Sequence, residues 1–494
     1  MRKILGRFGT MAGITASAAM LVAASGIPAQ AQTFTTLYSF DSTDGANPRA
    51  GVVQATDGNL DGTTASGGAA GSGTVFKLTL SGTLTTLYSF CSQSGCTDGG
   101  QPYAPLIHAT DGNFYGTTEY GGANGPYDGT VFRITPTGTL NTLYSFCSQS
   151  GCADGEQPAG ALVQVGNGNF YGATFGGGAN GGGTIFKITP SGTLTTLYNF
   201  CSEDPPYGCT DGWHPRSLLG ATTDGNLYGT TSAGGAGSGG TIFKITPSGA
   251  LTTLYSFCSE SSCADGEDPN AGLVQATDGN FYGTTALGGA AGGGTVFKLT
   301  PSGTLTTLYS FVCAPGSCAD GEFPGAGLVL ATDGNLYGTT NYGGPAGWGT
   351  VFRITPTGTL TTLHRFAGYP ADGANPEAAL VQATNGKFYG TTAAGGPLGA
   401  CTNGCGTVFS LAAGLGPFVE IQPTCGKVGQ PIKIVGTNLT GAAGVTFAGM
   451  PAVFTVVSSA LIKAIVPVGA ASGAVQVTLR NGTLFSNVPF RVLP

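Results

Sequence analysis

One cassette of about 55 residues recurs seven times along this chain, and this repetition constrains the fold more than any other feature. A pentamer related to Phe-Tyr-Gly-Thr-Thr stands at residues 60–64, 114–118, 170–174, 227–231, 281–285, 336–340 and 388–392. A second element, Gly-Thr-Val/Ile-Phe, ends at residues 76, 132, 186, 243, 297, 352 and 409. A fixed period of this length is typical of propellers, solenoids and arrays, in which each unit buries its faces against its neighbours.

Each cassette contains four short segments that are rich in β-branched and aromatic residues. In the fifth copy they cover residues 271–275, 280–285, 294–300 and 304–311. Gly, Asp, Asn or Pro bounds each segment, and Asp278-Gly279 suits a tight hairpin because both residues tolerate positive φ. No helical periodicity follows the N-terminal segment. The sequence therefore predicts an all-β fold of four-stranded units, which is the pattern of a propeller blade.

The two ends of the repeat array predict that the units close into a ring. Residues 33–40 match the fourth segment type but have no unit before them. The seventh copy has only the first three types, at 378–382, 387–392 and 406–411. A strand left over at one end can complete the unit at the other, which a solenoid does not need. We therefore expect a seven-bladed β-propeller closed by the N-terminal strand, with an open stack as the alternative.

Residues 1–31 have the pattern of a secretory signal peptide. They begin with three basic residues, continue through a small and apolar stretch, and end in Ala29-Gln30-Ala31, a small-x-small cleavage pattern. We expect the mature chain to begin at Gln32 and to be secreted, extracellular or held at the cell surface. No later segment has roughly 18 uncharged apolar residues in a row, so we expect no membrane span.

The composition limits the class of partner. Glycine accounts for 88 of 494 residues, but 41% hydrophobic and 10% aromatic content favours a folded chain in which glycine serves turns. The net charge of −7 becomes −10 once the three cations of the signal peptide are removed. An acidic surface disfavours nucleic acid and anionic membranes. We therefore expect a monomer with an extracellular glycan or protein as partner.

Twelve of the thirteen cysteines form short local pairs. The pairs are Cys91/Cys96, Cys147/Cys152, Cys201/Cys209, Cys258/Cys263, Cys313/Cys318 and Cys401/Cys405. Zinc binding is the alternative, but the chain has only three histidines and none stands beside a pair. In an exported chain such pairs indicate disulfides, which we expect to stiffen loops rather than hold the core. Cys425 has no local partner and should be free or join two chains.

An Asp-Gly dipeptide follows every fourth segment. The aspartates are Asp44, Asp98, Asp154, Asp211, Asp265, Asp320 and Asp372. Ring closure would gather these carboxylates at one mouth of the channel, where they could bind a hydroxylated ligand or a cation such as calcium. The alternative is that each aspartate bonds the backbone of its own loop as an Asx-turn. We expect no other cofactor, no other metal and no catalytic residue.

A second set of aspartates lies in the turns between the first and second segments, on the opposite face. They are Asp57, Asp111, Asp224, Asp278 and Asp333, and two copies carry Asn167 and Asn385 instead. A turn tolerates this exchange, whereas a carboxylate ligand would lose its charge. We interpret this second set as turn formers.

The repeat resembles the GloVer-type (Gloeo/Verruco) tandem repeat of secreted bacterial proteins with various C-terminal anchors. The resemblance rests on the Tyr-Gly-Thr-Thr, Gly-Gly, Gly-Thr-Val-Phe-Lys and Thr-Leu-Tyr-Ser-Phe elements and covers about residues 33–411. It implies export and a propeller-like repeat without established chemistry. One departure is Asp61, which replaces the pentamer tyrosine of the other copies. If it is buried, Asp61 needs a partner, and Arg49 is the candidate; the alternative is that the first blade exposes it.

Residues 417–494 lack the cassette and resemble an IPT/TIG domain, an immunoglobulin-like sandwich. The residues that carry this resemblance include Ile421, Pro423, Gly436, Val466 and Phe490. The family implies a spacer or binding module. No sorting tail follows Pro494, so we expect the anchor of the relatives to be missing. The predicted organisation is a signal peptide at 1–31, a propeller at 32–413 and an IPT/TIG domain at 414–494.

Three functions remain open at this point. A secreted, non-catalytic binding module or structural repeat protein is favoured, because the usual catalytic motifs are absent. An exported carbohydrate-active hydrolase or lyase is the alternative, since propellers can present carboxylate pairs on one face. Such a pair should appear as exceptions in one or two blades. A purely structural surface-layer component is the third.

Overall fold

The structure is a computed structural model that describes residues 32–166, 168–202, 208–219, 222, 224–313 and 318–493. The predicted signal peptide at 1–31 and the predicted turn residue Asn167 lie outside the described residues. The fold is all-β, and the described residues contain no α-helix. The short 3₁₀ turns are η1 (Ser94–Cys96), η2 (Ser150–Cys152), η3 (Ser261–Cys263) and η4 (Leu439–Gly441). None of the described helices is long and apolar enough to cross a membrane.

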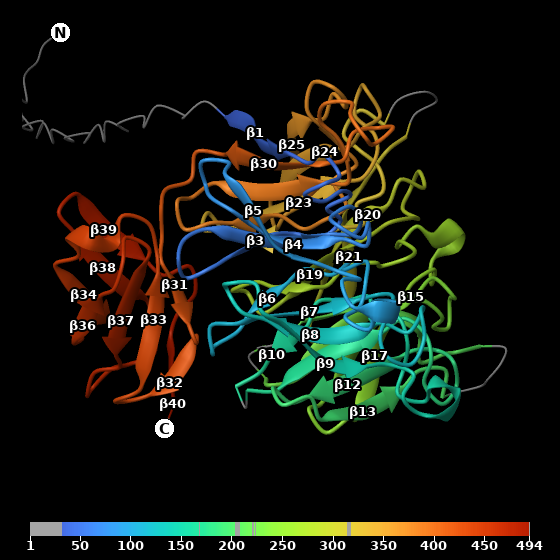
Figure 1. Cartoon of the computed structure of the whole chain (residues 1–494), viewed down its shortest axis with the longest axis horizontal. Helices are drawn as coiled ribbons and strands as arrows, with labels where there is room; N and C mark the ends of the chain where they lie inside the picture. Colours follow the sequence, from blue (N-terminus) through green and yellow to red (C-terminus); the bar gives the residue numbers. More distant parts are fainter. Residues whose placement is uncertain are drawn as a thin grey trace, which may run out of the picture.

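The repeat region folds into four-stranded antiparallel sheets, which we number 1 to 7 along the chain (Figure 1). Sheet 1 is β2 (Val53–Gln54), β3 (Leu60–Thr64), β4 (Thr74–Leu78) and β5 (Leu84–Ser89); sheet 2 is β6 (Ile107–His108), β7 (Phe114–Thr118), β8 (Thr130–Ile134) and β9 (Leu140–Ser145). Sheet 3 is β10 (Val163–Gln164), β11 (Phe170–Thr174), β12 (Thr184–Ile188) and β13 (Leu194–Asn199); sheet 4 is β14 (Trp213–Leu219), β15 (Leu227–Ala233), β16 (Thr241–Ile245) and β17 (Leu251–Ser256).

Sheets 5 and 6 repeat this order, and sheet 7 combines the two ends of the repeat region. Sheet 5 is β18 (Val274–Gln275), β19 (Phe281–Thr285), β20 (Thr295–Leu299) and β21 (Leu305–Ser310); sheet 6 is β22 (Val329–Leu330), β23 (Leu336–Thr340), β24 (Thr350–Ile354) and β25 (Leu360–Arg365). Sheet 7 is β27 (Val381–Gln382), β28 (Phe388–Thr392), β30 (Thr407–Ala412) and β1 (Thr33–Ser39), with β26 (Gly373–Ala374) and β29 (Ala394–Gly395) pairing beside it.

The predicted pairing of the N-terminal strand with the last repeat is confirmed. Strand β1 runs antiparallel to β30, from Thr33 opposite Ala412 to Ser39 opposite Thr407. The predicted first strands are too long, however. In sheet 5 only Val274 and Gln275 pair with β19, because Ala271 already accepts a hydrogen bond at 3.0 Å from Thr230 of sheet 4.

Side-chain packing explains why glycine recurs at the third position of the pentamer. Gly116 on β7 lies opposite Phe132 on β8, whose ring covers it. A Cβ atom at Gly116 would stand 2.6 Å from the tip of that ring, so only glycine lets the phenylalanine lie flat on the sheet. The Gly and Phe elements that recur in every cassette are therefore two halves of one contact.

The hydrophobic cores lie between neighbouring sheets rather than within them. Phe90, which follows sheet 1, packs edge-on against Phe132 of sheet 2 at 5.2 Å between ring centroids. Phe40, which follows β1, makes the same contact with Phe76 of sheet 1 at 5.3 Å. Burying each ring contributes roughly 1.5–3 kcal/mol. The same type of contact therefore joins sheet 7 to sheet 1 and sheet 1 to sheet 2.

The C-terminal region is a separate sandwich. Its strands are β31 (Glu420–Gln422), β32 (Cys425–Lys427), β33 (Pro431–Val435), β34 (Gly444–Phe447), β35 (Met450–Pro451), β36 (Phe454–Val456), β37 (Leu461–Ile465), β38 (Val475–Leu479), β39 (Gly482–Phe485) and β40 (Arg491–Leu493). Sheets β31-β33-β37-β36 and β35-β34-β38-β39 enclose one core, and β32 pairs in parallel with β40.

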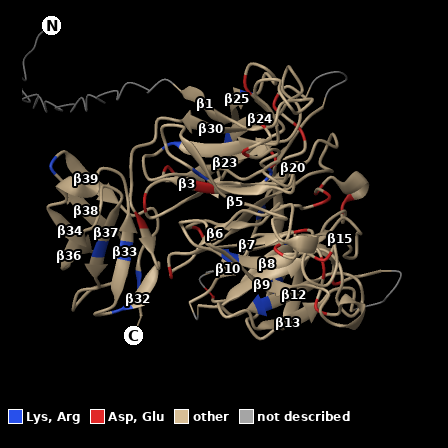
Figure 2. Cartoon of the chain, in the orientation of Figure 1, with Lys and Arg blue, Asp and Glu red and all other residues tan. Residues whose placement is uncertain are grey.

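This sandwich covers the hairpin turns of the repeat region. Phe418 donates its backbone N–H to Thr384 at 3.0 Å, and the Lys433 ammonium donates to the Thr110 carbonyl at 3.1 Å. The long loops of the repeats extend from the opposite face (Figure 1). Asp and Glu recur in those loops, while Lys and Arg are few (Figure 2). We call the two sides the turn face and the loop face.

Candidate functional site

Each predicted ring aspartate is bound by the last strand of its own repeat. Its carboxylate accepts a hydrogen bond from the residue at one fixed position of that strand, a tyrosine in six copies and a histidine in the last. The pairs are Tyr38–Asp44, Tyr88–Asp98, Tyr144–Asp154, Tyr198–Asp211, Tyr255–Asp265, Tyr309–Asp320 and His364–Asp372.

Asp98 shows that both oxygens of such a carboxylate accept hydrogen bonds from its own repeat. Tyr88 and the Ser92 hydroxyl and N–H donate to one oxygen at 2.8–2.9 Å, and the Gln93 N–H donates to the other at 3.3 Å. Asp98 is fully buried. Such contacts resemble the loop-bonding alternative, but the donors precede the aspartate by five or more residues, so the motif is a loop clamp rather than an Asx-turn.

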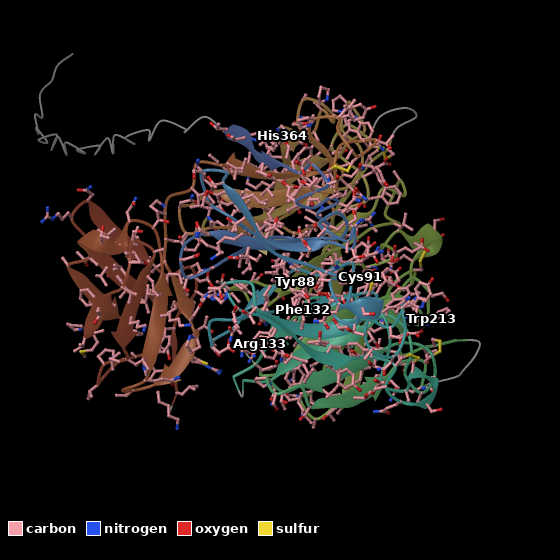
Figure 3. All side chains as sticks on the ribbon, viewed as in Figure 1. Tyr88, Cys91, Phe132, Arg133, Trp213 and His364 are labelled. Carbon is pink, nitrogen blue, oxygen red and sulfur yellow. A yellow bond between two sulfur atoms is a disulfide. The ribbon has the colours of Figure 1, made fainter. Side chains whose placement is uncertain are left out.

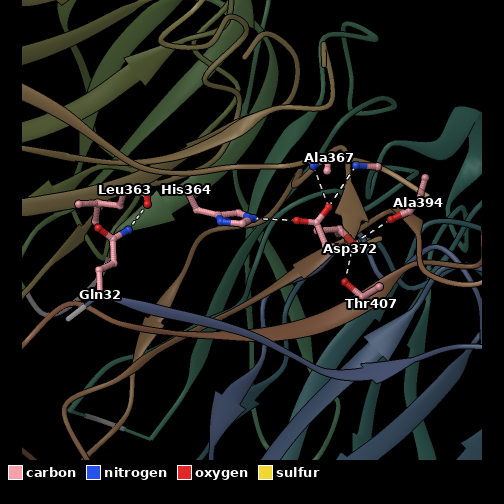
Figure 4. Close-up of polar contacts among 9 residues, drawn as sticks. Gln32, Leu363, His364, Ala367, Asp372, Ala394 and Thr407 are labelled. Carbon is pink, nitrogen blue, oxygen red and sulfur yellow. Dashed lines mark hydrogen bonds and ion pairs between the residues drawn. The ribbon is translucent and has the colours of Figure 1, made fainter. Parts of the chain in front are cut away.

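The last copy shows that the clamp tolerates a change of donor. His364 takes the tyrosine position and lies 2.9 Å from Asp372, while the N–H groups of Ala367 and Gly368 donate to the other oxygen at 2.8 and 3.1 Å (Figure 4). His364 is therefore an ordinary substitution within a structural motif. A ligand or calcium site on these seven carboxylates remains a prediction.

All six predicted cysteine pairs are joined by disulfide bonds in the structure, and Cys425 is free. The bonds lie in the long loops, where Cys91 is drawn near Tyr88 (Figure 3). Five of them close the same loops as the aspartate clamps. The loop face is therefore stiffened twice in most repeats.

Burial of the Cys201–Cys209 disulfide corrects the expectation that these bonds take no part in the packed interior. Cys201 is 7% exposed and Cys209 is 8% exposed. The Cys209 carbonyl accepts the N–H groups of Gly212 and Gly235 at 2.8 and 3.0 Å, which holds this end of the loop against sheet 4. The prediction of a loop-only role is therefore wrong for this pair, because both of its cysteines lie among the buried apolar residues.

Cys405 departs further from the same expectation. It is 1% exposed and belongs to the hydrophobic core cluster between sheets 7 and 1, together with Phe40 and Phe76. The residue stands two positions before β30, and its carbonyl accepts the Asn47 N–H at 2.9 Å. The prediction that the cysteine pairs stiffen loops rather than hold the core is therefore wrong for Cys405, whose bond to Cys401 ties a loop to the join between the first and last sheets.

The turn-face aspartates form Asx-turns, as predicted. The backbone N–H two residues later donates to the side-chain oxygen at 2.9–3.1 Å in every described copy. These residues are Asp57, Asp111, Asp224, Asp278, Asp333 and Asn385. In sheets 2, 4, 5 and 6 the pentamer tyrosine also donates its hydroxyl to the same carboxylate.

Asp61 breaks this pattern, and its predicted partner is wrong. The side chain is 0% exposed, and neither carboxylate oxygen has a hydrogen-bond partner among the described residues. Burial raises the pKa of this carboxyl to about 7, against the opposing effect of Lys77. Arg49 instead pairs with Glu377 at 3.3 Å, because it lies at the other end of the first strand, near the loop face.

The repeats differ most in residue type just before the first strand of each sheet. A proline occupies this place in every copy, and the next residue is Arg49, Tyr103, Ala159, Arg216, Asn270, Gly325 or Glu377. The proline is structural: Cδ of Pro102 would lie 2.9 Å from a Cβ atom at Gly73 of the preceding repeat. The residue after it has no such constraint, which leaves it free to differ between copies.

The residue before that proline also diverges. It is Asn47, Gln101, Gln157, His214, Asp268, Phe323 or Asn375, and its φ lies between 52° and 58° in every case. Residues other than glycine adopt this left-handed conformation only at a cost of roughly 1 kcal/mol or more. The seven copies therefore hold five residue types, with Asn and Gln twice each, in one unusual backbone geometry.

Several of these divergent residues gather at the inner edges of the sheets. The first strands crowd together there, since a Cβ atom at Gly51 of sheet 1 would stand 2.8 Å from the Ala379 carbonyl oxygen of sheet 7. We define the inner-edge cluster as the charged and aromatic residues that interact across sheets at this place: Arg49, Tyr103, Glu119, Phe175, His214, Arg216, Asp268 and Glu377.

Contacts within the inner-edge cluster join sheets that are distant in sequence. Arg49 bonds Glu377 and lies 5.3 Å from the centroid of the Tyr103 ring. Burial raises the pKa of the Glu119 carboxyl, while Arg216 and Arg49 oppose that rise. Since Glu119 senses cations from sheets 1 and 4, the cluster spans the centre of the repeat region rather than one sheet.

Arg216 and His214 extend from β14 onto one aromatic ring. The Arg216 guanidinium lies 4.5 Å from the centroid of Phe175, and His214 stacks on the same ring at 3.8 Å. Burial lowers the pKa of His214 to about 4, with a further contribution from Arg216, so this imidazole is neutral near pH 7. Burial also lowers the pKa of Arg216, against the opposing effects of Asp268 and Glu119.

A cavity of about 550 Å³ opens on the loop face beside this cluster. Gln101, Tyr120, Tyr127 and Gln157 are among its lining residues, and the two tyrosine rings meet edge to face at 6.0 Å. Tyr127 is 67% exposed, which is unusual for a large aromatic side chain. The cavity offers ring faces and amide groups, and Glu119 precedes Tyr120 in the chain.

Sequence reasoning missed most of this site because it searched for what the copies share. Arg49 was considered only as a partner for Asp61, and Glu119, Arg216, Asp268 and Glu377 were not singled out. The signal was available in the columns on either side of the invariant proline, where seven aligned copies show no common residue type.

Comparisons with known proteins identify the two parts of the chain. The family described as Gloeobacter/Verrucomicrobia repeat matches residues 9–210, 149–330 and 314–428, and the IPT/TIG domain family matches residues 418–492. No curated protein matches the sequence.

Among solved structures, a periplasmic gluconolactonase from Pseudomonas aeruginosa is 17% identical with a TM-score of 0.42; the match covers 74% of this chain and 96% of that one. A protein described as a "putative 6-phosphogluconolactonase" from Bacteroides uniformis is 18% identical with a TM-score of 0.42, covering 64% and 84%. Both scores are too low to carry an argument about activity.

Proposed function

We propose that this chain, which belongs to the Gloeobacter/Verrucomicrobia repeat family and carries an IPT/TIG domain, is a secreted, non-catalytic glycan-binding protein. In this proposal residues 32–413 form a closed seven-bladed propeller, and residues 414–494 form a spacer on its turn face. The protein acts as a monomer outside the cytoplasm or at the cell surface. The ligand binds on the loop face.

Contacts between the first and last repeats support the closed ring. Thr391 of sheet 7 donates its hydroxyl to the Ala50 carbonyl at 2.9 Å, as Thr284 of sheet 5 does to Ala326 of sheet 6 at 3.0 Å. The Gln54 side chain also accepts the Thr384 N–H at 2.9 Å. Export is supported by six disulfides, which persist in oxidising compartments.

The divergence of the inner-edge cluster is the observation that carries the binding role. Residues that serve the fold are repeated in every copy, whereas this cluster differs between copies. Tyr120, the chain neighbour of Glu119, lines a cavity of about 550 Å³. Ligand sites favour cavities with aromatic walls and a few polar groups on loops held by a rigid scaffold. Tyr120 and Tyr127 can stack on sugar rings, and Gln101 and Gln157 can bond their hydroxyl groups.

A glycan array tests this proposal. We expect the full-length protein to bind a defined set of glycans and the Tyr120→Ala/Tyr127→Ala variant to lose most of that binding. Tyr342→Ala is the matched control, since Tyr342 is the exposed equivalent of Tyr120 in sheet 6. Absence of binding to any glycan, or equal loss in the control, would contradict a glycan-binding loop face.

An exported carbohydrate-active enzyme is the second candidate. Glu119, Asp268 and Glu377 are exceptions within the repeat, and burial raises the pKa of all three carboxyl groups. A raised pKa suits a general acid. Turnover of a polysaccharide that disappears in Glu119→Gln or Glu377→Gln would favour this candidate over the binding protein.

A further inference from the structure

Arg216 is a cation without a counter-ion contact. Its Nε atom is buried and has no hydrogen-bond partner, and no carboxylate oxygen of a described residue lies within 4.0 Å of its guanidinium. Arg49, the other arginine of the inner-edge cluster, pairs directly with Glu377. Arg216 is half-buried as a residue, and a guanidinium that is partly shielded from water without an ion partner is costly to the fold. Such a group is retained where something outside the chain can pair with it.

The surroundings of Arg216 keep its side chain ready to receive an anion. Phe175 lies beneath the guanidinium at 4.5 Å, which holds the planar group by cation–π attraction. Arg216 lies on β14, the only first strand of seven residues among the described sheets, while the other first strands have two. A longer strand fixes the backbone on both sides of the arginine. The fork of N–H donors therefore has a defined direction before any ligand arrives.

Hydrogen-bond acceptors surround this cation. Glu119 and Asp268 both act on Arg216 electrostatically from sheets 2 and 5. The Asn270 amide donates to Asp268, and its side-chain oxygen is buried and lacks a partner within the described part of the chain. A ligand that satisfies all of these groups must carry one anionic group and several hydroxyl donors.

We propose that Arg216 binds the carboxylate of an acidic sugar, a uronic acid residue, while Glu119 and Asp268 accept hydrogen bonds from its hydroxyl groups. A carboxylate matches the guanidinium fork in a bidentate way. A phosphate is disfavoured, because its second charge would face the carboxylates of Glu119 and Asp268. This inference rests on the proposed glycan-binding function and names the ligand class of the same site.

The cavity beside the inner-edge cluster accommodates the neighbouring sugars of such a chain. Tyr120, which follows Glu119, lines the cavity together with Tyr127. In this proposal an oligosaccharide whose acidic residue lies at Arg216 continues past Glu119 to both tyrosine rings. The tyrosines supply contacts that are independent of charge, and Arg216 supplies the preference for an acid.

Calorimetric titration with two matched ligands tests the inference. The probes are oligogalacturonate and the neutral galacto-oligosaccharide of the same length. We expect the protein to prefer the acidic ligand by at least about tenfold, since a shielded charged hydrogen bond is worth that much or more. Arg216→Gln should abolish this preference, because it weakens binding of the acidic ligand by at least about tenfold more than binding of the neutral one. Arg216→Lys, which keeps the charge but loses the fork, should restore only part of it.

Arg480→Gln is the control, because Arg480 is an exposed cation in the C-terminal sandwich. Equal affinity for the two ligands, or an acid preference that survives in Arg216→Gln, would overturn the inference while leaving the binding function intact. The inference would also be overturned if Arg216→Gln weakened the binding of both ligands equally while a thermal melt showed the variant to be folded. Absence of binding to either ligand, and to every glycan of the array, would overturn the proposed function itself.

Discussion

The turn face and the inner edge of the loop face use the same repeat in opposite ways. On the turn face, every described copy closes its first hairpin with an Asp or Asn that accepts the N–H two residues later. At the inner edge, the two residues flanking an invariant proline range from Arg and Glu to Phe and Gly. Both places constrain the backbone, by a tight turn on the turn face and by a positive φ at the inner edge. The turn requires one kind of side chain and therefore repeats it, whereas the inner edge accepts several kinds.

The first test removes the strand that joins the two ends of the repeat region. Deleting residues 33–40 leaves β30 with an unpaired edge and takes Phe34 and Phe40 from their cores. We expect the deletion variant to lose its cooperative unfolding transition. We also expect it to aggregate, which size-exclusion chromatography would show. Phe34→Ala, which keeps the strand, should cost only about 3 kcal/mol. A monomeric deletion variant with unchanged melting temperature would contradict the role of this strand.

The second test restores the repeat where Asp61 breaks it. The folded-state pKa of about 7 lies above the ordinary value of 3.8, so the folded chain holds this proton more tightly than the unfolded chain. The resulting stability is present below about pH 4 and is lost as pH rises through 7. Asp61→Tyr should therefore be more stable than wild type by up to about 4 kcal/mol at pH 8 and by less at pH 5.

The measurement is the difference in unfolding free energy between variant and wild type across pH 4–8. Asp61→Asn removes the titration without adding a ring, so it separates the proton effect from packing. A difference that does not change with pH in either variant would show that Asp61 is not buried as a carboxylic acid.

A third test compares aspartates on the two faces. Asp98→Ala leaves the donors of Tyr88, Ser92 and Gln93 without their acceptor and should cost about 3 kcal/mol. Asp111→Ala removes an exposed turn bond and the Tyr115 contact, and should cost about 1 kcal/mol. Urea denaturation of both variants gives the comparison. Equal costs would argue against the loop clamp as a buried structural element.

The smallest change in unfolding free energy is expected for variants of the inner-edge cluster. Glu377→Gln removes the ion pair with Arg49, whose side chain is 45% exposed, and should change stability by less than about 1 kcal/mol. The matched variant Arg49→Gln should behave in the same way. Thermal unfolding of both would show whether the fold depends on this pair. A large loss in either variant would assign the inner-edge cluster to structure rather than to ligand binding.

Features within one cassette could be predicted well. The strand types, the cysteine pairs and the turn aspartates depend on residues close in sequence, and each pattern recurs in several copies. The paired strands at the two ends were predictable because a missing element in one copy matched an extra element elsewhere. The function of the ring aspartates was harder, since an Asp-Gly in a loop is equally compatible with a ligand site and with the clamp formed by Tyr88 and Ser92.

The burial of individual cysteines was not predictable in the same way. The pairing of Cys401 with Cys405 follows from their spacing, but the place of Cys405 in a core does not. That place depends on sheet 1, which lies at the other end of the repeat region and packs against sheet 7. Local sequence therefore predicts which cysteines join, and the packing of neighbouring sheets decides how deeply they lie.

Local residue types and their repetition were enough to predict the period, the four strands of each unit, the disulfide pairs and the packing of each unit against its neighbours. Which divergent residues meet depends instead on how the sheets pack. Arg49 and Glu377 stand at opposite ends of the repeat region, and they touch because sheet 7 packs against sheet 1. Asp61 is buried rather than paired for a related reason: its environment is set by the packing of neighbouring sheets, which no single cassette contains.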